Sequence, residues 1–189
     1  AGQPNIATDH QLPATLKSER VRLVALCDLN PRVAEYAAKH QVKAYTDYAA
    51  MLADPEVELV EVATPDQFHC RHALAALAAG KHVLLQKPPC VNRAEMAQLI
   101  AAAKAAPGKI GVLINQRHAV LSRSLKHYLE RFFIGELREI IIRYRGRRFP
   151  IENPQSFYLT SESGGVWLHN SLHWLDEAVA YSGKLPESV

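Results

Sequence analysis

Lys87 has the setting that most clearly suggests chemistry. It directly follows the apolar run HVLLQ and precedes two prolines, Pro88 and Pro89. Each proline fixes its own φ and keeps the residue before it out of the helical region, so the lysine is aimed in one direction. A lysine amine titrates near about 10.4 unless burial or a neighbouring cation lowers its pKa. The segment either ends a strand and nothing more, or it positions an amine for a reaction.

Two histidines, His169 and His173, form the second candidate. The run VWLHNSLHWLDEAVAYSG predicts a helix, and an i, i+4 spacing places both imidazoles on one face of it. They could share acid–base work or bind a metal, but two histidines with no acidic ligand nearby are a poor metal signature, so no metal is expected. His169 could also be a packed or solvent-facing residue.

The elements that must position these residues alternate along the chain. Apolar β-prone runs occupy 21–28, 58–65, 82–87 and 109–117. Helical patterns lie over 31–40, 46–54, 68–80, 93–106 and 121–133. Strands and helices of this length predict βαβ units, which means an α/β fold with a parallel sheet covered by helices on both faces.

Polar residues stand where the predicted strands end. Asp28, Thr64 with Pro65, Lys87 and Asn115 all occupy such ends, where ligands bind in sheets of this kind. A carboxylate at Asp28 can accept from ribose hydroxyls and would repel a 2′-phosphate, which favours NAD over NADP. The same carboxylate could instead cap the helix that follows.

The start of the chain gives a weak phosphate-loop signal. It reads AGQPNIA, with Gly2 as the candidate glycine and no strand before it. We therefore expect the first strand of a dinucleotide-binding domain to be missing. After Gly135 a near-alternating strand over 137–149 is predicted, which would open a second sheet. The domain boundary is expected near 117–137.

Composition narrows the class of protein. The formal charge is +3, and the arginines around Arg143 and Arg145 are expected to form a solvated strand face, so nucleic acid is not an expected partner. Three cysteines have spacings that suit neither zinc nor a disulfide framework, which favours a reduced cytoplasmic protein. No apolar run approaches the roughly 18 residues of a membrane span.

Three stretches, taken together, resemble the glucose–fructose oxidoreductase/inositol dehydrogenase (Gfo/Idh/MocA) family. They are ATPDQFHCRHALAALAAGKHVLLQKP at 63–88, NQR at 115–117 and GGVWLHNSLHWLD at 164–176. The resemblance implies a Rossmann-type doubly wound parallel sheet over 1–118. It also implies, over 119–189, the truncated start of an α/β domain with an open, mostly antiparallel sheet. That second sheet would build a homo-oligomer, either a dimer or a tetramer.

The resemblance also implies an activity, which is hydride transfer between NAD or NADP and a hydroxyl carbon. The small-molecule substrate would be a sugar, a polyol or a sugar-derived acid. Lys87 and His173 would carry the proton chemistry, with His169 as a modified third member. The implied cofactor positions are Gly2, Asp28, Thr64, Pro65, His69, Gln86, Lys87 and Asn115, and the implied substrate positions are Arg117, Trp167 and His169.

Two departures from the family pattern keep a rival interpretation open. Gln86 stands where the family usually has Glu, and His169 stands where it usually has Asp. Both changes remove a carboxylate from the expected proton relay, so a non-catalytic sensor or regulator that binds dinucleotide is the alternative. Trp167 could pack against substrate or fill the junction between the domains.

Overall fold

The computed structural model describes residues 7–131, 135–143 and 165–186. The chain divides into two compact units that interleave along the sequence. The first contains Ala1–Thr64, Arg71–Leu85 and Gln98–Gly111, and the second contains Pro65–Cys70, Gln86–Ala97 and Val112–Val189. The sequence-based boundary at 118 stays a prediction.

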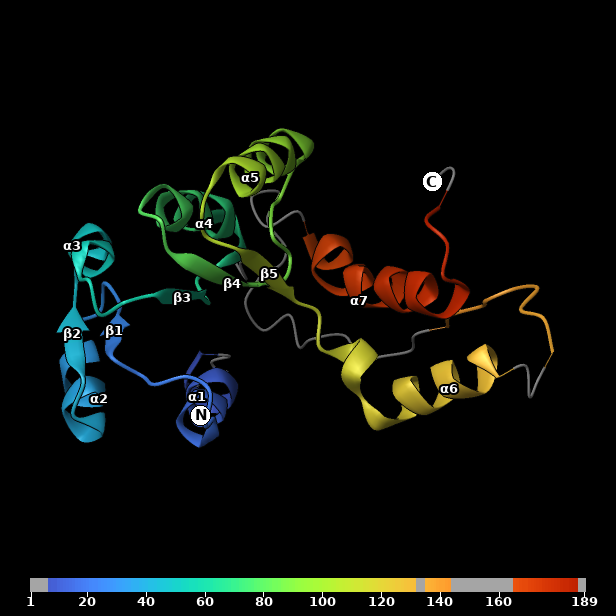
Figure 1. The fold of residues 1–189 in the computed structure, drawn as a ribbon, viewed down its shortest axis with the longest axis horizontal. Coiled ribbons are helices and arrows are strands. Elements are labelled where there is room, and N and C mark those ends of the chain that lie inside the picture. The colour runs from blue at the N-terminus through green and yellow to red at the C-terminus, as the bar shows by residue number, and fades with distance from the viewer. Residues whose placement is uncertain (1–6, 132–134, 144–164, 187–189) are drawn as a thin grey trace. The chain divides into compact units, whose positions relative to one another are not determined.

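Within the described residues, five short strands form two sheets (Figure 1). In one sheet, β1 (Ala25–Cys27) pairs in parallel with β2 (Lys43–Tyr45), and Leu26 lies opposite Ala44. In the other, β3 (Leu59–Val62), β4 (His82–Gln86) and β5 (Ile110–Leu113) lie in that order. β3 and β4 are parallel, with Val60 opposite Val83. Parallel pairing with intervening helices confirms the α/β prediction.

A helix is present at each predicted place, and α1 is a helix that the sequence analysis did not predict. The helices are α1 (Leu12–Lys17) after a π-helical turn η1 (Ala7–Gln11), α2 (Val33–His40), α3 (Tyr48–Ala53), α4 (His69–Ala78) after the 3-10 turn η2 (Asp66–Phe68), α5 (Arg93–Ala105), α6 (Val120–Glu130) after η3 (Gln116–His118), and α7 (Gly165–Ser182). Asp47 caps α3 by accepting a hydrogen bond from the Ala49 N–H at 2.8 Å, as its residue type predicts. Gly80 ends the α4 segment with φ at +75°, a conformation that favours glycine.

The core of the first unit lies between α4 and the β3–β4 pair. Its fully buried side chains include Ala73, Ala76 and Leu77 on α4, and Val83 and Leu85 on β4. Alanines on the inner face let the helix backbone come close to the strands. Burying each Val or Leu side chain contributes about 1.5–3 kcal/mol, so this interface holds β4 and therefore its end in place.

The second unit contains α6 and α7, which contact each other. Arg117 in η3 makes a bidentate ion pair with Asp176 on α7, with one N–O distance of 2.6 Å. Ser122 on α6 donates a hydrogen bond to the carboxylate of Glu177, the residue after Asp176 on α7. These contacts join the start of α6 to the middle of α7.

The strand predicted over 137–149 is not present where it can be tested. The described residues 135–143 have no regular secondary structure, and Ile141 is exposed. A strand needs a hydrogen-bonded neighbour, and the described part of the chain provides none for this segment. Residues 144–149 lie outside the described ranges, and they include Arg145. Gly2 also lies outside them.

Among the described helices, none is both long enough and apolar enough to cross a membrane.

The close approach of Gly108 to the chain before β4 predicts a stability effect. A Cβ added at Gly108 would lie 2.2 Å from the Lys81 carbonyl oxygen. Gly108→Ala should therefore lower the free energy of unfolding of the intact protein by about 1–3 kcal/mol, because backbone must move. Gly111→Ala is the control, since its Cβ would meet only Leu84 Cδ1 at an ordinary 3.7 Å. Equal urea midpoints for the two variants would contradict the close contact.

Candidate active site

Lys87 lies directly after β4 and is almost completely buried, with 8% of its surface exposed. Its Nζ donates a hydrogen bond to the main-chain oxygen of His169 on α7 at 2.8 Å. The Lys87–Pro88 peptide bond is cis. Behind the lysine, the buried ring of His69 places its Nδ1 2.6 Å from the Pro88 oxygen. The lysine is therefore fixed on both sides, as the two prolines led us to expect.

The surroundings of Lys87 change its protonation. Burial removes water from the amine and lowers its pKa to about 8, and the nearby negative charge of Asp66 partly opposes that shift. The lysine can therefore gain or lose a proton close to neutral pH. An ordinary surface lysine cannot do this, because its ammonium form persists to about pH 10.

The carboxylate of Asp66 lies beside the lysine and bonds to His169. Asp66 Oδ2 and His169 Nδ1 are 2.8 Å apart, and both side chains are largely buried. The sequence analysis did not single out Asp66 as a site residue. In the structure it lies within the 3-10 turn η2, and its carboxylate contacts α7. The sequence signal that could have identified Asp66 was its position just beyond the carboxyl end of β3.

His173 is the third member of this cluster. It is buried, and its Nδ1 has no hydrogen-bond partner among the described residues. Burial lowers its pKa first, the positive charges of Lys87 and His169 lower it further, and Asp176 and Glu177 act in the opposite direction. His173 is therefore a neutral imidazole at physiological pH, with one ring nitrogen that can accept a proton.

The first unit holds the positions predicted to bind the adenosine side of a dinucleotide. Asp28 is exposed immediately after β1, as an acid that contacts a ribose must be. Its Oδ1 accepts a hydrogen bond from the Asn30 N–H at 2.8 Å, which forms a local turn. The alternative role as a helix cap is wrong, because the N-cap of α2 is Arg32 and no side chain caps it. Thr64 follows β3, and its Oγ1 lies 3.2 Å from His72 Nδ1. An exposed carboxylate at this strand end fits the chemistry of a ribose diol.

The remaining predicted positions have varied surroundings. Pro65 and Asn115 are exposed near strand ends, and Gln86 is half-buried at the last position of β4. Arg117 uses its guanidinium to bind Asp176. Trp167 lies on α7, but its side chain is outside the described part of the structure. Cofactor and substrate contacts at these positions, and at His69, stay predictions.

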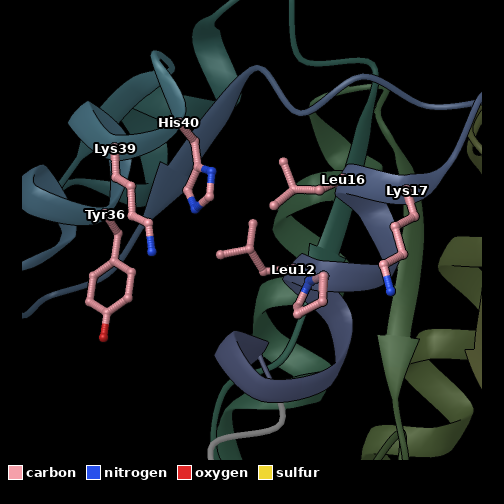
Figure 2. Close-up of a pocket in the computed structure, with 7 residues that line it drawn as sticks. Leu12, Leu16, Lys17, Tyr36, Lys39 and His40 are labelled. Carbon is pink, nitrogen blue, oxygen red and sulfur yellow. The ribbon is translucent and has the colours of Figure 1, made fainter.

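A separate pocket opens between α1 and α2 in the first unit (Figure 2). Its volume is about 320 Å³, and Leu12 and Leu16 face the side chains of Tyr36 and His40 across it. None of the predicted site residues lines this pocket. Its lining also includes the cationic side chains of Lys17 and Lys39.

The protonation of Lys87 can be measured directly. In the intact protein with ¹³C-labelled lysine methylenes, the NMR signal that Lys87→Met removes should titrate near pH 8, below the other lysines. Because the pKa falls from 10.5 in the unfolded chain to about 8, the unfolded state binds the extra proton between these values, and stability should rise with pH across this window. Asp66→Asn should lower the pKa further, because the carboxylate favours the ammonium form, whereas Asp47→Asn should not. A Lys87 signal that titrates with the other lysines would contradict this.

Comparison with known proteins identifies the family of the chain. A family model described as an oxidoreductase family with an NAD-binding Rossmann fold matches residues 1–114. A 1-carboxy-3-chloro-3,4-dihydroxycyclohexa-1,5-diene dehydrogenase from Comamonas testosteroni is 33% identical, over 87% of this chain and 42% of the relative. A human trans-1,2-dihydrobenzene-1,2-diol dehydrogenase is 30% identical, over 90% of this chain and 50% of the relative. The chain thus spans about half the length of the curated relatives it matches.

Solved structures give the same fold. A probable dehydrogenase from Thermotoga maritima has a TM-score of 0.76 at 26% identity and covers 92% of this chain and 51% of its own. An apo scyllo-inositol dehydrogenase from Lactobacillus casei has a TM-score of 0.78 over 97% of this chain and 53% of its own, and at 21% identity it supports the fold alone. The family model, the two curated relatives and the Rossmann-type fold agree, and the chain belongs to the Gfo/Idh/MocA family of NAD-binding oxidoreductases.

Proposed function

We propose that the intact protein is a dehydrogenase that transfers a hydride between a nicotinamide cofactor and a hydroxyl-bearing carbon of a small molecule. The observation that carries this proposal is the buried cluster of Lys87, His169 and His173. It combines an amine that titrates near pH 8 with a neutral imidazole whose buried Nδ1 has no hydrogen-bond partner among the described residues. Oxidation of an alcohol needs a group of this kind to take the O–H proton.

Each member of the cluster has a distinct task in this proposal. Lys87 has one N–H on the His169 carbonyl, and its ammonium form has two more to donate to the substrate oxygen. Nδ1 of His173 accepts the hydroxyl proton. The bound nicotinamide supplies the acceptor for the hydride. In the reverse direction the same two side chains return the proton to the carbonyl oxygen.

Asp66 and His169 position and tune the other two groups. The family usually has carboxylates where Gln86 and His169 stand in this chain. Here Asp66 brings a negative charge to the lysine from a different element, and it holds the His169 ring in one orientation. The missing carboxylates at positions 86 and 169 are the main argument against turnover. Asp66 removes that argument, because it gives the ammonium form of Lys87 a counter-charge.

The substrate class follows from the relatives and from the cluster. Two curated relatives are named as dehydrogenases of ring compounds that carry adjacent hydroxyls. Two hydrogen-bonding groups, the Lys87 amine and the His173 imidazole, suit a substrate that offers more than one oxygen. We therefore propose a cyclic diol, polyol or sugar-derived compound with vicinal hydroxyls.

The proposal extends to the oligomeric state and the location of the protein. A homo-oligomer rests on the family resemblance, and a cytoplasmic location rests on the unpaired cysteines, which are all free in the structure. If Lys87→Met leaves turnover unchanged in the experiment below, the alternative is a sensor that binds dinucleotide without turnover.

The catalytic assignment can be tested with Lys87→Met in the intact protein. Turnover of a vicinal ring diol with NAD should fall about 10²–10⁴-fold, because the substrate oxygen loses the donor that assists transfer of its proton to His173. NADH affinity measured by calorimetry should change little. Lys104→Met, at an exposed position of α5, is the control and should keep full turnover. Unchanged turnover in Lys87→Met would refute the assignment.

Cofactor choice can be tested separately at Asp28. Calorimetric titration of the intact protein should give tighter binding of NADH than of NADPH, because the carboxylate repels a 2′-phosphate. Asp28→Ser should weaken NADH binding and narrow the difference between the two cofactors. Asp47→Ser, which keeps a helix-capping side chain, is the control. Equal affinities in the unmodified protein would remove the assigned role of Asp28.

A further inference from the structure

A second cluster of reactive side chains lies within the second unit. Cys70 is at the start of α4, Cys90 is in the connection between β4 and α5, and Glu95 is in the first turn of α5. The two sulfur atoms and a carboxylate oxygen of Glu95 all lie within 4.8 Å of one another. Both cysteines are buried, with 3% and 5% of their surface exposed. The sequence separations of these residues gave no indication of this grouping.

The spacing of the three atoms is compatible with a bound metal ion. Tetrahedral zinc has Zn–S distances of about 2.3 Å and Zn–O distances of about 2.0–2.2 Å, which place neighbouring ligand atoms roughly 3.5–3.8 Å apart. The ligand atoms of this cluster all lie within 4.8 Å of one another, and neither cysteine forms a disulfide. The three side chains are therefore close enough to share one ion.

The Glu95 carboxylate is already oriented. Its Oε2 accepts a hydrogen bond from the Val91 N–H at 3.1 Å, and the side chain of Asn92 accepts from the Glu95 N–H at 2.9 Å. This pair of bonds resembles a capping box, and it leaves the other carboxylate oxygen available. Metal ligands are commonly held by hydrogen bonds of this type from outside the coordination sphere.

The charge pattern is consistent with a cation. The two thiols hydrogen-bond each other, and the negative charge of Glu95 lies close to both. Three groups that would repel one another as anions share a poorly hydrated space. A divalent cation would favour the thiolate forms, and each thiol would release its proton on binding.

We propose that Cys70, Cys90 and Glu95 bind one thiophilic divalent cation, zinc being the best match, with water in the fourth position. The ion would tie α4 and the start of α5 to the loop that begins at Lys87. Binding converts two thiols and one M²⁺ into a dithiolate complex and two released protons, with no change in oxidation state. The site does not depend on the proposed oxidoreductase activity, and its test needs no substrate.

The test uses the intact protein, reduced and freed of metal by a chelator, and titrated with Cd²⁺ and then Zn²⁺. We expect one Cd²⁺ per chain, an ultraviolet band from thiolate-to-metal charge transfer, and a higher melting temperature because the ion binds only the folded state. Cys70→Ser and Cys90→Ser should each weaken binding by at least about tenfold. Cys27→Ser, a cysteine outside the cluster, is the matched control. Glu95→Gln keeps the hydrogen bonds at the start of α5. Weaker Cd²⁺ binding in this variant would therefore show that the carboxylate charge contributes to the affinity.

Several results would overturn the proposal. Absence of the charge-transfer band in the folded protein would do so, as would equal Cd²⁺ affinity in the double variant Cys70→Ser/Cys90→Ser. A Cys70–Cys90 disulfide that forms without reductant and prevents Cd²⁺ binding would show that the pair is a redox couple. If the serine variants do not fold, X-ray absorption of the Cd²⁺-bound unmodified protein decides, because the site requires two sulfur ligands.

Discussion

The removal of one amine from water is the constraint on which the site depends. An ammonium group that loses its hydration must find acceptors and a counter-charge, or give up its proton. Lys87 finds a main-chain oxygen on α7 and the nearby carboxylate of Asp66, and burial still brings its pKa down to about 8. The end of β4, the turn after β3 and the first half of α7 must therefore all be in place before the lysine can act.

Features set by nearby residues were predictable from the sequence. Helical patterns over 46–54 and 68–80 gave the positions of α3 and α4. The prolines after Lys87 indicated a fixed lysine at a strand end, and the i, i+4 spacing placed His169 and His173 together on α7. Each of these signals lies within a few residues of the feature that it predicts, which is why one sequence was enough.

Features set by distant residues were not predictable. Asp66 and His169 are separated by 103 positions, and no periodicity relates them. The grouping of Cys70 with Cys90 depends on how α4 packs near the loop after β4, which spacing cannot reveal. The alternation over 137–149 led to an incorrect strand in its described part, because an alternating pattern does not supply the hydrogen-bonded neighbour that a strand requires.

The turn after β1 has a consequence for how a ligand would bind there. Because one oxygen of Asp28 already accepts the Asn30 N–H, the carboxylate is held in a single rotamer before any ligand arrives. A side chain that is ordered in advance loses little conformational entropy on binding, so more of each new hydrogen bond appears as affinity. The local turn and the proposed ligand recognition therefore use the same preorganised carboxylate.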